Sequence, residues 1–250
     1  MRYFISILLI INSLVAKSQT KMRPLEALIN DKETAWTLVK DWIKSAKNKV
    51  EILAVDTATA KDALYKTQVT TRSPMGAIVY MTGGFLIDNG WIRVLGSGNP
   101  KLNRTLPDWN KGKTFTEFGE AMPFLLIADD AIGGFFLLNG GGLGADVGKV
   151  YYLSPDNLDY EPLDLSYSDF LGFCFNHDLN SFYKDLRWKN WQKDVSTLDG
   201  NQVFSFIPFL WTKEGKNINK NSRKAIPIEE QYNVTLDFRK QLELNNQKKD

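Results

Sequence analysis

The stretch "GGFFLLNGGGLGADVGKVYYLSPDNLDYEPLDLSYSDFL" (133–171) decides the fold class of this chain. It contains an apolar run, a cluster of glycines, a second apolar run, an acidic turn and a helix start flanked by Ser and Asp. A phosphate-binding glycine loop lies between a strand and a helix, where backbone N–H groups face the anion. Here the glycines precede the β-type run VYYL, which favours the connector of a β-hairpin over a nucleotide site.

The residues before this stretch predict two helices separated by a strand. Apolar residues recur at helical spacing over 31–46, KVEILAV (49–55) alternates as a strand, and Asp56 or Thr57 can cap a second helix. Pro74 is expected to end this helical region.

The next part of the chain is predicted to be mainly β. The runs 76–84 and 84–98 are expected as strands, with Asn89-Gly90 as a type I′ hairpin turn because both central residues need positive φ. Residues 97–120 are rich in Pro and Gly and predict a long surface loop with one helical turn at 106–110. Three further strands are expected within 123–154.

The C-terminal third is predicted to be mostly helical. Helices are expected near Ser166 or Ser168, from Asp178, and after Gln231, while Pro208 limits 202–212 to an edge strand or extended segment. This order predicts an α+β fold with an antiparallel or mixed sheet and helices packed on one side. We expect a single domain over 22–240, followed by a polar, frayed tail at 241–250.

The N-terminus has the layout of a cleavable secretory signal. Arg2 precedes the apolar run 3–15, and the small residues Ala16 and Ser18 lie before Gln19. We therefore expect a signal peptide at 1–18, cleavage near Ser18/Gln19, and a secreted or periplasmic protein whose only membrane contact is through this signal. The alternative from the same residues is a buried helix or a permanent anchor.

Charge and cysteine content exclude several classes of protein. The chain has 31 basic and 29 acidic residues, and removal of 1–18 would take away Arg2 and Lys17 and leave the two counts equal. A neutral surface provides little phosphate neutralisation, so we expect no nucleic-acid partner. Cys174 is the only cysteine, lies between two phenylalanines, and is expected to be a buried thiol.

Few residues are suited to acid–base chemistry or metal binding. His177 is the only histidine and is expected in a turn between helices, so the sequence predicts no metal site and no cofactor. Asp129 and Asp130 form the most site-like carboxylate pair, because they follow an apolar run at the expected rim of a sheet. Adjacent strand residues face opposite sides, and the pair also fits an ordinary hairpin turn, which is the favoured interpretation.

Two further groups are candidate contact residues. Thr71, Arg72 and Ser73 can bind a carboxylate or phosphate, or they can form a turn in which Arg72 pairs with a nearby acid. Trp109, Trp188 and Trp191 are candidates for an exposed contact surface, and coverage of the core explains them equally well.

Several motifs resemble a known bacterial family. These are MRPLEALI (22–29), TTRSPMGAIVYMTGGFLIDNGWIRVLGSG (70–98), LLIADDAIGGFFLLNGG (125–141) and FSFIPFLWT (204–212), which resemble the DUF2625 proteins. Met22 resembles the usual start of that family, so residues 1–21 are either an added export signal or an over-extended start, in which case the protein is cytoplasmic. This family implies no established activity.

The opening stretch also has a more distant resemblance, to the SUKH (SMI1/KNR4-like) superfamily. The matching positions are Gly134, the NGG turn at 139–142, Gly148, Pro155-Asp156 and the helix start at 167–171. This resemblance implies an α+β fold, and many such domains are immunity proteins that neutralise toxins.

These observations lead to a functional hypothesis and an alternative. We expect a non-catalytic protein-binding module whose partner is a toxin or an envelope protein. The alternative is a cell-envelope hydrolase that acts on glycan through carboxylates, centred on Asp129, Asp130, Arg72 and Trp109.

Overall fold

The structure is a computed structural model that describes residues 21–247, with side chains through residue 243. The predicted signal peptide (1–18) lies outside the described residues. The strands are β1 (Val50–Ile52), β2 (Gly84–Ile87), β3 (Ile92–Leu95), β4 (Phe124–Asp130), β5 (Phe135–Asn139), β6 (Val150–Leu153), β7 (Tyr160–Leu165), β8 (Gln202–Ile207) and β9 (Ser222–Pro227). The helices are α1 (Leu25–Leu28), α2 (Trp36–Lys44), α3 (Thr57–Thr67), α4 (Pro74–Met81), α5 (Leu106–Asn110), α6 (Tyr167–Asn176), α7 (Leu179–Phe182), α8 (Trp191–Val195) and α9 (Ile228–Gln247), with a 3₁₀ turn at Glu214–Lys216.

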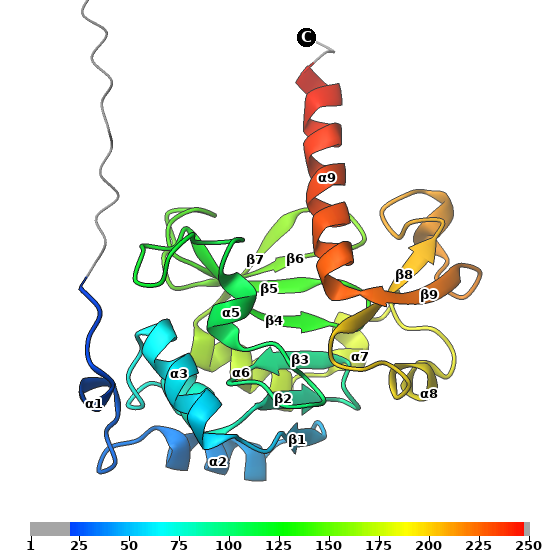
Figure 1. Ribbon diagram of the computed structural model, residues 1–250. Coiled ribbons are helices and arrows are strands. Elements are labelled where there is room, and N and C mark those ends of the chain that lie inside the picture. Colours follow the sequence, from blue (N-terminus) through cyan, green and yellow to red (C-terminus); the bar gives the residue numbers. More distant parts are fainter. Residues whose placement is uncertain (1–20, 248–250) are drawn as a thin grey trace, which may run out of the picture.

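A seven-stranded antiparallel sheet forms the centre of the molecule (Figure 1). Its strands follow chain order from β1 to β7, and β8 and β9 form a separate two-stranded sheet. The sequence predicted the α+β class, and the structure confirms it.

Helices cover both faces of this sheet. The Phe136 ring packs on Phe170 of α6, with 4.9 Å between centroids, whereas the adjacent Phe135 packs on Tyr232 of α9 at 5.1 Å. Because adjacent strand residues point to opposite faces, α6 and α9 lie on opposite sides. The expectation that helices pack on one side is therefore wrong in this detail (Figure 1).

The hairpin turn between β2 and β3 matches its prediction. Asn89 and Gly90 have φ of 61° and 84°, and the Trp91 N–H donates to the Asp88 carbonyl at 3.2 Å. Positive φ at both central residues is the requirement of a type I′ turn.

Helix α4 replaces the strand that the sequence predicted at 76–84. Pro74 is the first helical residue, and the Ser73 hydroxyl accepts a hydrogen bond from Gly76 N–H at 3.1 Å. Pro at this position and Ser at the N-cap start a helix, so Pro74 begins a helix here. Residues 75–79 are all buried, and a helix surrounded by core shows no polar face in its sequence.

The C-terminal region contains two strands that the sequence did not predict. β7 follows the acidic turn and lies at the sheet edge, where Pro162 is tolerated. β9 pairs with β8 along its whole length, and β8 ends directly before Pro208, as expected for 202–212. Helix α9 continues to Gln247, so much of the stretch predicted as a frayed tail is helical.

The Asn110 side chain helps to fix the long connection 97–120 to the sheet. Its helical turn is α5, at the predicted residues. Asn110 donates to the Leu126 carbonyl at 2.9 Å and accepts from Leu126 N–H at 2.8 Å. The amide of Asn110 therefore pairs with β4 as a neighbouring strand would.

Candidate functional site

Asp129 and Asp130 are the last two residues of β4, and both are fully buried. Asp130 is also the first residue of the β4–β5 turn, since Gly133 N–H donates to its carbonyl at 3.2 Å. The interpretation of this pair as part of a hairpin turn therefore holds for Asp130, whereas Asp129 lies within the strand. The two carboxylates have separate partners, as expected for adjacent strand residues that face opposite sides.

Two arginines hold the Asp129 carboxylate. Arg93 Nε lies 2.5 Å from Asp129 Oδ1, and Arg104 Nη1 lies 2.7 Å from Oδ2. Arg104 also donates to the Gly200 carbonyl at 2.8 Å, and Arg93 donates to the carbonyls of Gln202 and Asp130. Burial lowers the pKa of Arg93, and the Asp129 charge opposes this effect. This cluster therefore joins β3, β4, the 97–105 loop and the start of β8.

Asp130 accepts four hydrogen bonds from within the chain. Tyr152 and Tyr183 hydroxyls donate to Oδ2 at 2.7 and 3.1 Å, and Gly134 and Ile132 N–H groups donate to Oδ1 at 2.8 and 3.1 Å. Burial raises the pKa of Asp130 and raises the pKa values of Tyr152 and Tyr183 well above their ordinary range. These hydrogen bonds occupy the acceptor positions of the carboxylate, so Asp130 has a structural role in the core.

The segment 71–73 forms a turn between α3 and α4. Thr71 is buried, and its hydroxyl accepts from Asn30 N–H at 2.7 Å. Arg72 is exposed and pairs with Glu33 at 2.8 Å, and Ser73 caps α4. Each side chain has a partner within the chain, which agrees with the turn interpretation.

The three candidate tryptophans are buried. Trp109 packs on Tyr232, with the Arg104 guanidinium 4.6 Å and Lys113 Nζ 4.1 Å from its ring centroid. Trp188 and Trp191 pack on Trp91 at 5.8 and 4.8 Å. The structure thus favours core coverage over an exposed contact surface for these residues.

The glycine loop connects β5 and β6, as predicted. Asn139 Oδ1 accepts from Gly141 and Leu143 N–H groups at 2.8 and 3.1 Å, and its Nδ2 donates to the Gly144 carbonyl and Asp146 at 3.0 Å. Part of the loop backbone is therefore satisfied by its own side chain. The Asn139 side-chain oxygen therefore accepts from loop N–H groups, as an anion does in a phosphate-binding loop.

The histidine and the cysteine lie where the sequence placed them. His177 follows α6 and stacks on Phe173 at 4.9 Å. Cys174 is buried, and burial raises its pKa well above the ordinary range. Among residues 21–243, no group of three His, Cys, Asp or Glu side chains could hold a metal ion. No helix within residues 21–247 is both long and apolar enough to cross a membrane.

A hollow of about 550 Å³ opens on the sheet face beside Arg93. Its charged lining residues are Lys49, Arg93, Lys101, Glu51 and Asp199, and Lys101 pairs with Glu51. The carboxylates Asp129 and Asp130 do not line this hollow. The candidate acids are thus separated from the nearest large opening.

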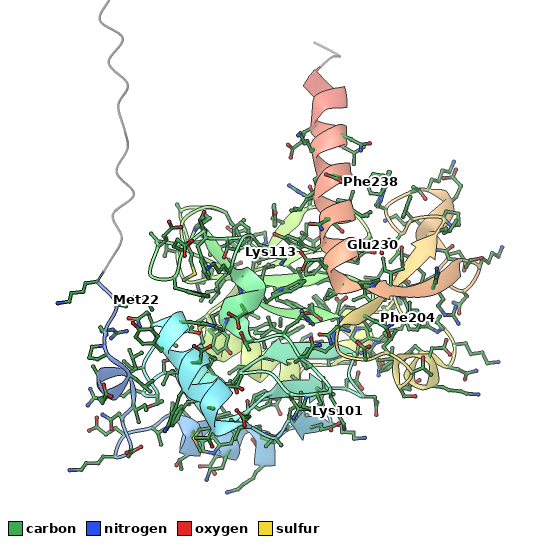
Figure 2. The ribbon with its side chains drawn as sticks, viewed as in Figure 1. Met22, Lys101, Lys113, Phe204, Glu230 and Phe238 are labelled. Atoms are coloured by element: carbon green, nitrogen blue, oxygen red, sulfur yellow. The ribbon has the colours of Figure 1, made fainter. Side chains whose placement is uncertain are left out.

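A different surface was missed by sequence reasoning. The rings of Phe209, Trp211 and Phe238 contact one another with centroids 4.9–6.0 Å apart, and all three are partly exposed. Ile207, two residues before Phe209 in the chain, is 71% exposed. We call these four residues the aromatic patch. Its Phe238 lies on α9, which projects from the body of the molecule (Figures 1 and 2). The sequence has seven tryptophans and does not show that Trp211 is partly exposed. Its exposure becomes clear only from its position beside α9 in the structure.

Comparison with known proteins identifies the family. The family model described as protein of unknown function DUF2625 matches residues 25–231. The chain belongs to the DUF2625 family. An uncharacterized protein of Haemophilus influenzae is 45% identical to this DUF2625 protein over 215 residues, which cover 86% of this chain and 94% of the relative. The uncharacterized protein YbfG of Escherichia coli K12 is 43% identical over 213 residues, 85% of this chain and 95% of YbfG.

The comparisons confirm the predicted DUF2625 membership. No solved structure matches this DUF2625 protein. The more distant resemblance to the SUKH superfamily stays a prediction.

Proposed function

We propose that this DUF2625 protein is a non-catalytic protein-binding module and that the aromatic patch is its contact surface. The observation that carries this proposal is the contact among three partly exposed rings beside Ile207, at the base of a projecting helix. Aromatic side chains dominate the energetics of protein interfaces, because they bury a large apolar area with few rotatable bonds.

The geometry of the carboxylates gives less support to the alternative, a glycan hydrolase. Such an enzyme needs two carboxyl groups that flank one bond of the substrate. Asp129 and Asp130 point to opposite faces of β4 and are occupied by arginines, tyrosines and backbone N–H groups. Arg72 is paired with Glu33, and Trp109 is buried.

The proposed partner is a toxin or another protein of the cell envelope. The mature chain would have equal numbers of basic and acidic residues, which gives little long-range electrostatic steering. Binding would then depend on apolar contact, which agrees with the composition of the aromatic patch.

A pair of matched surface variants tests the contact surface. Ile207→Glu places a negative charge in the aromatic patch. Val147→Glu places the same charge outside the patch, at a valine that is 66% exposed in the β5–β6 loop. Immobilised wild-type chain should capture a partner from envelope extract that, once identified and purified, binds with a measurable Kd. Ile207→Glu should weaken this binding at least about tenfold, while Val147→Glu should not.

Two results would contradict the proposal. One is equal binding by both variants. The other is turnover of a glycan by purified chain that captures no protein.

We further propose that the protein is exported. Mass spectrometry of the native N-terminus should find Gln19 as the first residue. An N-terminus at Met1 or Met22 would argue against export by a cleaved signal.

A further inference from the structure

A second cavity lies on the side of the molecule away from the aromatic patch. It has a volume of about 280 Å³ and is enclosed by the first described residues, the end of α3, α5, the 115–122 loop and the start of β4. Figure 2 shows Met22, which lines it, on the opposite side of the molecule from Phe238.

The interior of this cavity is apolar. Pro107, Phe115, Met122 and Leu125 line it from three separate segments of the chain. An engineered apolar cavity of roughly 150 Å³ takes up benzene and stays dry, so a space of 280 Å³ has room for an alkyl chain of about ten carbons.

The charged residues that line the cavity are mostly cationic. They are Lys21, Arg23 and Lys66, with Glu120 as the one carboxylate among the lining residues. Lys66 is already paired with Asp62 at 2.7 Å and Asp108 at 3.1 Å. Lys21 and Arg23 are therefore the cations best placed to meet a ligand.

Gln68 holds Arg23 in place. The Gln68 side chain accepts from Arg23 N–H at 2.8 Å and donates to the Arg23 carbonyl at 3.2 Å, while the Arg23 guanidinium donates to the Gln68 carbonyl. A guanidinium has five N–H donors, so donors remain for an anion. The cationic edge is thus fixed against the end of α3.

We propose that this cavity binds an amphiphilic anion, with its alkyl chain among Phe115, Met122 and Leu125 and its carboxylate or phosphate at Lys21 and Arg23. A small set of polar groups at the mouth of an apolar pocket is the usual arrangement of a small-molecule site. The inference does not depend on the aromatic patch, which lies elsewhere.

Methionine methyl groups provide a local readout. Of the described methionines, Met22 and Met122 line the cavity, Met75 is buried in α4, and Met81 is 38% exposed at the end of α4. In chain labelled at methionine methyls, decanoate should shift the signals of Met22 and Met122 saturably, while Met75 and Met81 stay unchanged. Decanol and decyltrimethylammonium, which lack the negative charge, should bind at least about tenfold more weakly.

Two variants test the cationic residues and the apolar space of the cavity separately. Lys21→Gln/Arg23→Gln should weaken decanoate binding at least about tenfold, whereas Lys49→Gln, an exposed lysine beside the Arg93 hollow, should not. Met122→Trp should fill the space and abolish the Met22 shift, with a thermal melt to verify folding. A shift of Met81 together with Met22 would show adsorption of a surfactant to the surface and would overturn the proposal, as would equal binding of decanol and decanoate.

A third experiment distinguishes a free amphiphilic anion from a lipid headgroup in a bilayer as the ligand. Decyl phosphate that binds while vesicles of phosphatidylglycerol do not sediment the chain would identify a free amphiphile. Sedimentation that Lys21→Gln/Arg23→Gln abolishes would identify a lipid in the membrane. Failure of both probes, together with decanoate, would overturn the proposal.

Discussion

At Asp129, one carboxylate lies between two buried guanidinium groups, from Arg93 on β3 and from Arg104 in the loop before α5. The sequence indicated Asp129 and Asp130 as candidates because two acids follow an apolar run. It could not assign their partners, because the arginines and tyrosines come from distant segments that only the strand register brings together. In a sequence, a buried carboxylate whose hydrogen-bonding positions are all occupied cannot be distinguished from a catalytic carboxylate.

Removal of the Asp129 carboxylate should be strongly destabilising. Asp129→Ala leaves two buried guanidinium groups without their counter-charge, and the loss of one partner from a buried ion pair costs about 3–5 kcal/mol. Glu33→Ala, which breaks the exposed pair with Arg72, should cost about 1 kcal/mol or less. Urea unfolding of the two variants measures the difference, and similar losses would contradict the structural role of Asp129.

Gly134 should not tolerate a side chain. A Cβ there would lie 2.3 Å from the Tyr152 hydroxyl and 2.5 Å from Asp130 Oδ2, both fixed in the core. Gly134→Ala should therefore cost about 1–3 kcal/mol of unfolding free energy. Gly172→Ala in α6, where a Cβ would meet nothing within 4 Å, should be neutral or stabilising by up to about 1 kcal/mol. Equal effects in a denaturant titration would contradict the packing at Gly134.

Among the elements, those with a local signal were predicted and those that depend on tertiary context were not. The spacing of apolar residues gave α2, and Asn89-Gly90 gave the β2–β3 hairpin. Helix α4 shows no helical period because it is buried on every side. β9 is mostly exposed, half of its residues are polar, and it forms a strand because β8 pairs with it.

The contact between α8 and β9 should make stability depend on pH. Hydrogen bonds from Trp188 Nε1 and from Arg223, both at 2.7 Å, lower the pKa of Asp194 below the ordinary 3.8. The unfolded chain then takes up the proton at higher pH, so this stabilisation is present above pH 3.8 and is lost as the pH falls through the folded-state pKa. When the pH is lowered from 6 into the acidic range, the free energy of unfolding should decrease less for Asp194→Asn than for wild type. Denaturant unfolding at each pH measures this difference. Parallel pH profiles would contradict this role for Asp194.

In the whole molecule, most of the candidate site residues of the sequence are buried, and the two proposed binding surfaces lie on opposite sides. The acids, tyrosines and tryptophans that the sequence offered as candidates hold the sheet to its covering helices. The aromatic patch lies beside α9, and the apolar cavity lies beside α3. Each surface includes residues of a motif that resembles the family, FSFIPFLWT (204–212) for the aromatic patch and MRPLEALI (22–29) for the cavity. Neither motif reveals a surface by itself, because each surface is completed by segments far apart in the chain.

The separation of stability from binding tests this account most directly. We would measure Tm and partner capture for Asp130→Asn and Ile207→Glu side by side, at a temperature where both are folded. The account predicts that Asp130→Asn lowers Tm and still captures the partner, while Ile207→Glu retains the wild-type Tm and loses capture. Folded Asp130→Asn that captures nothing, together with wild-type capture by Ile207→Glu, would contradict it.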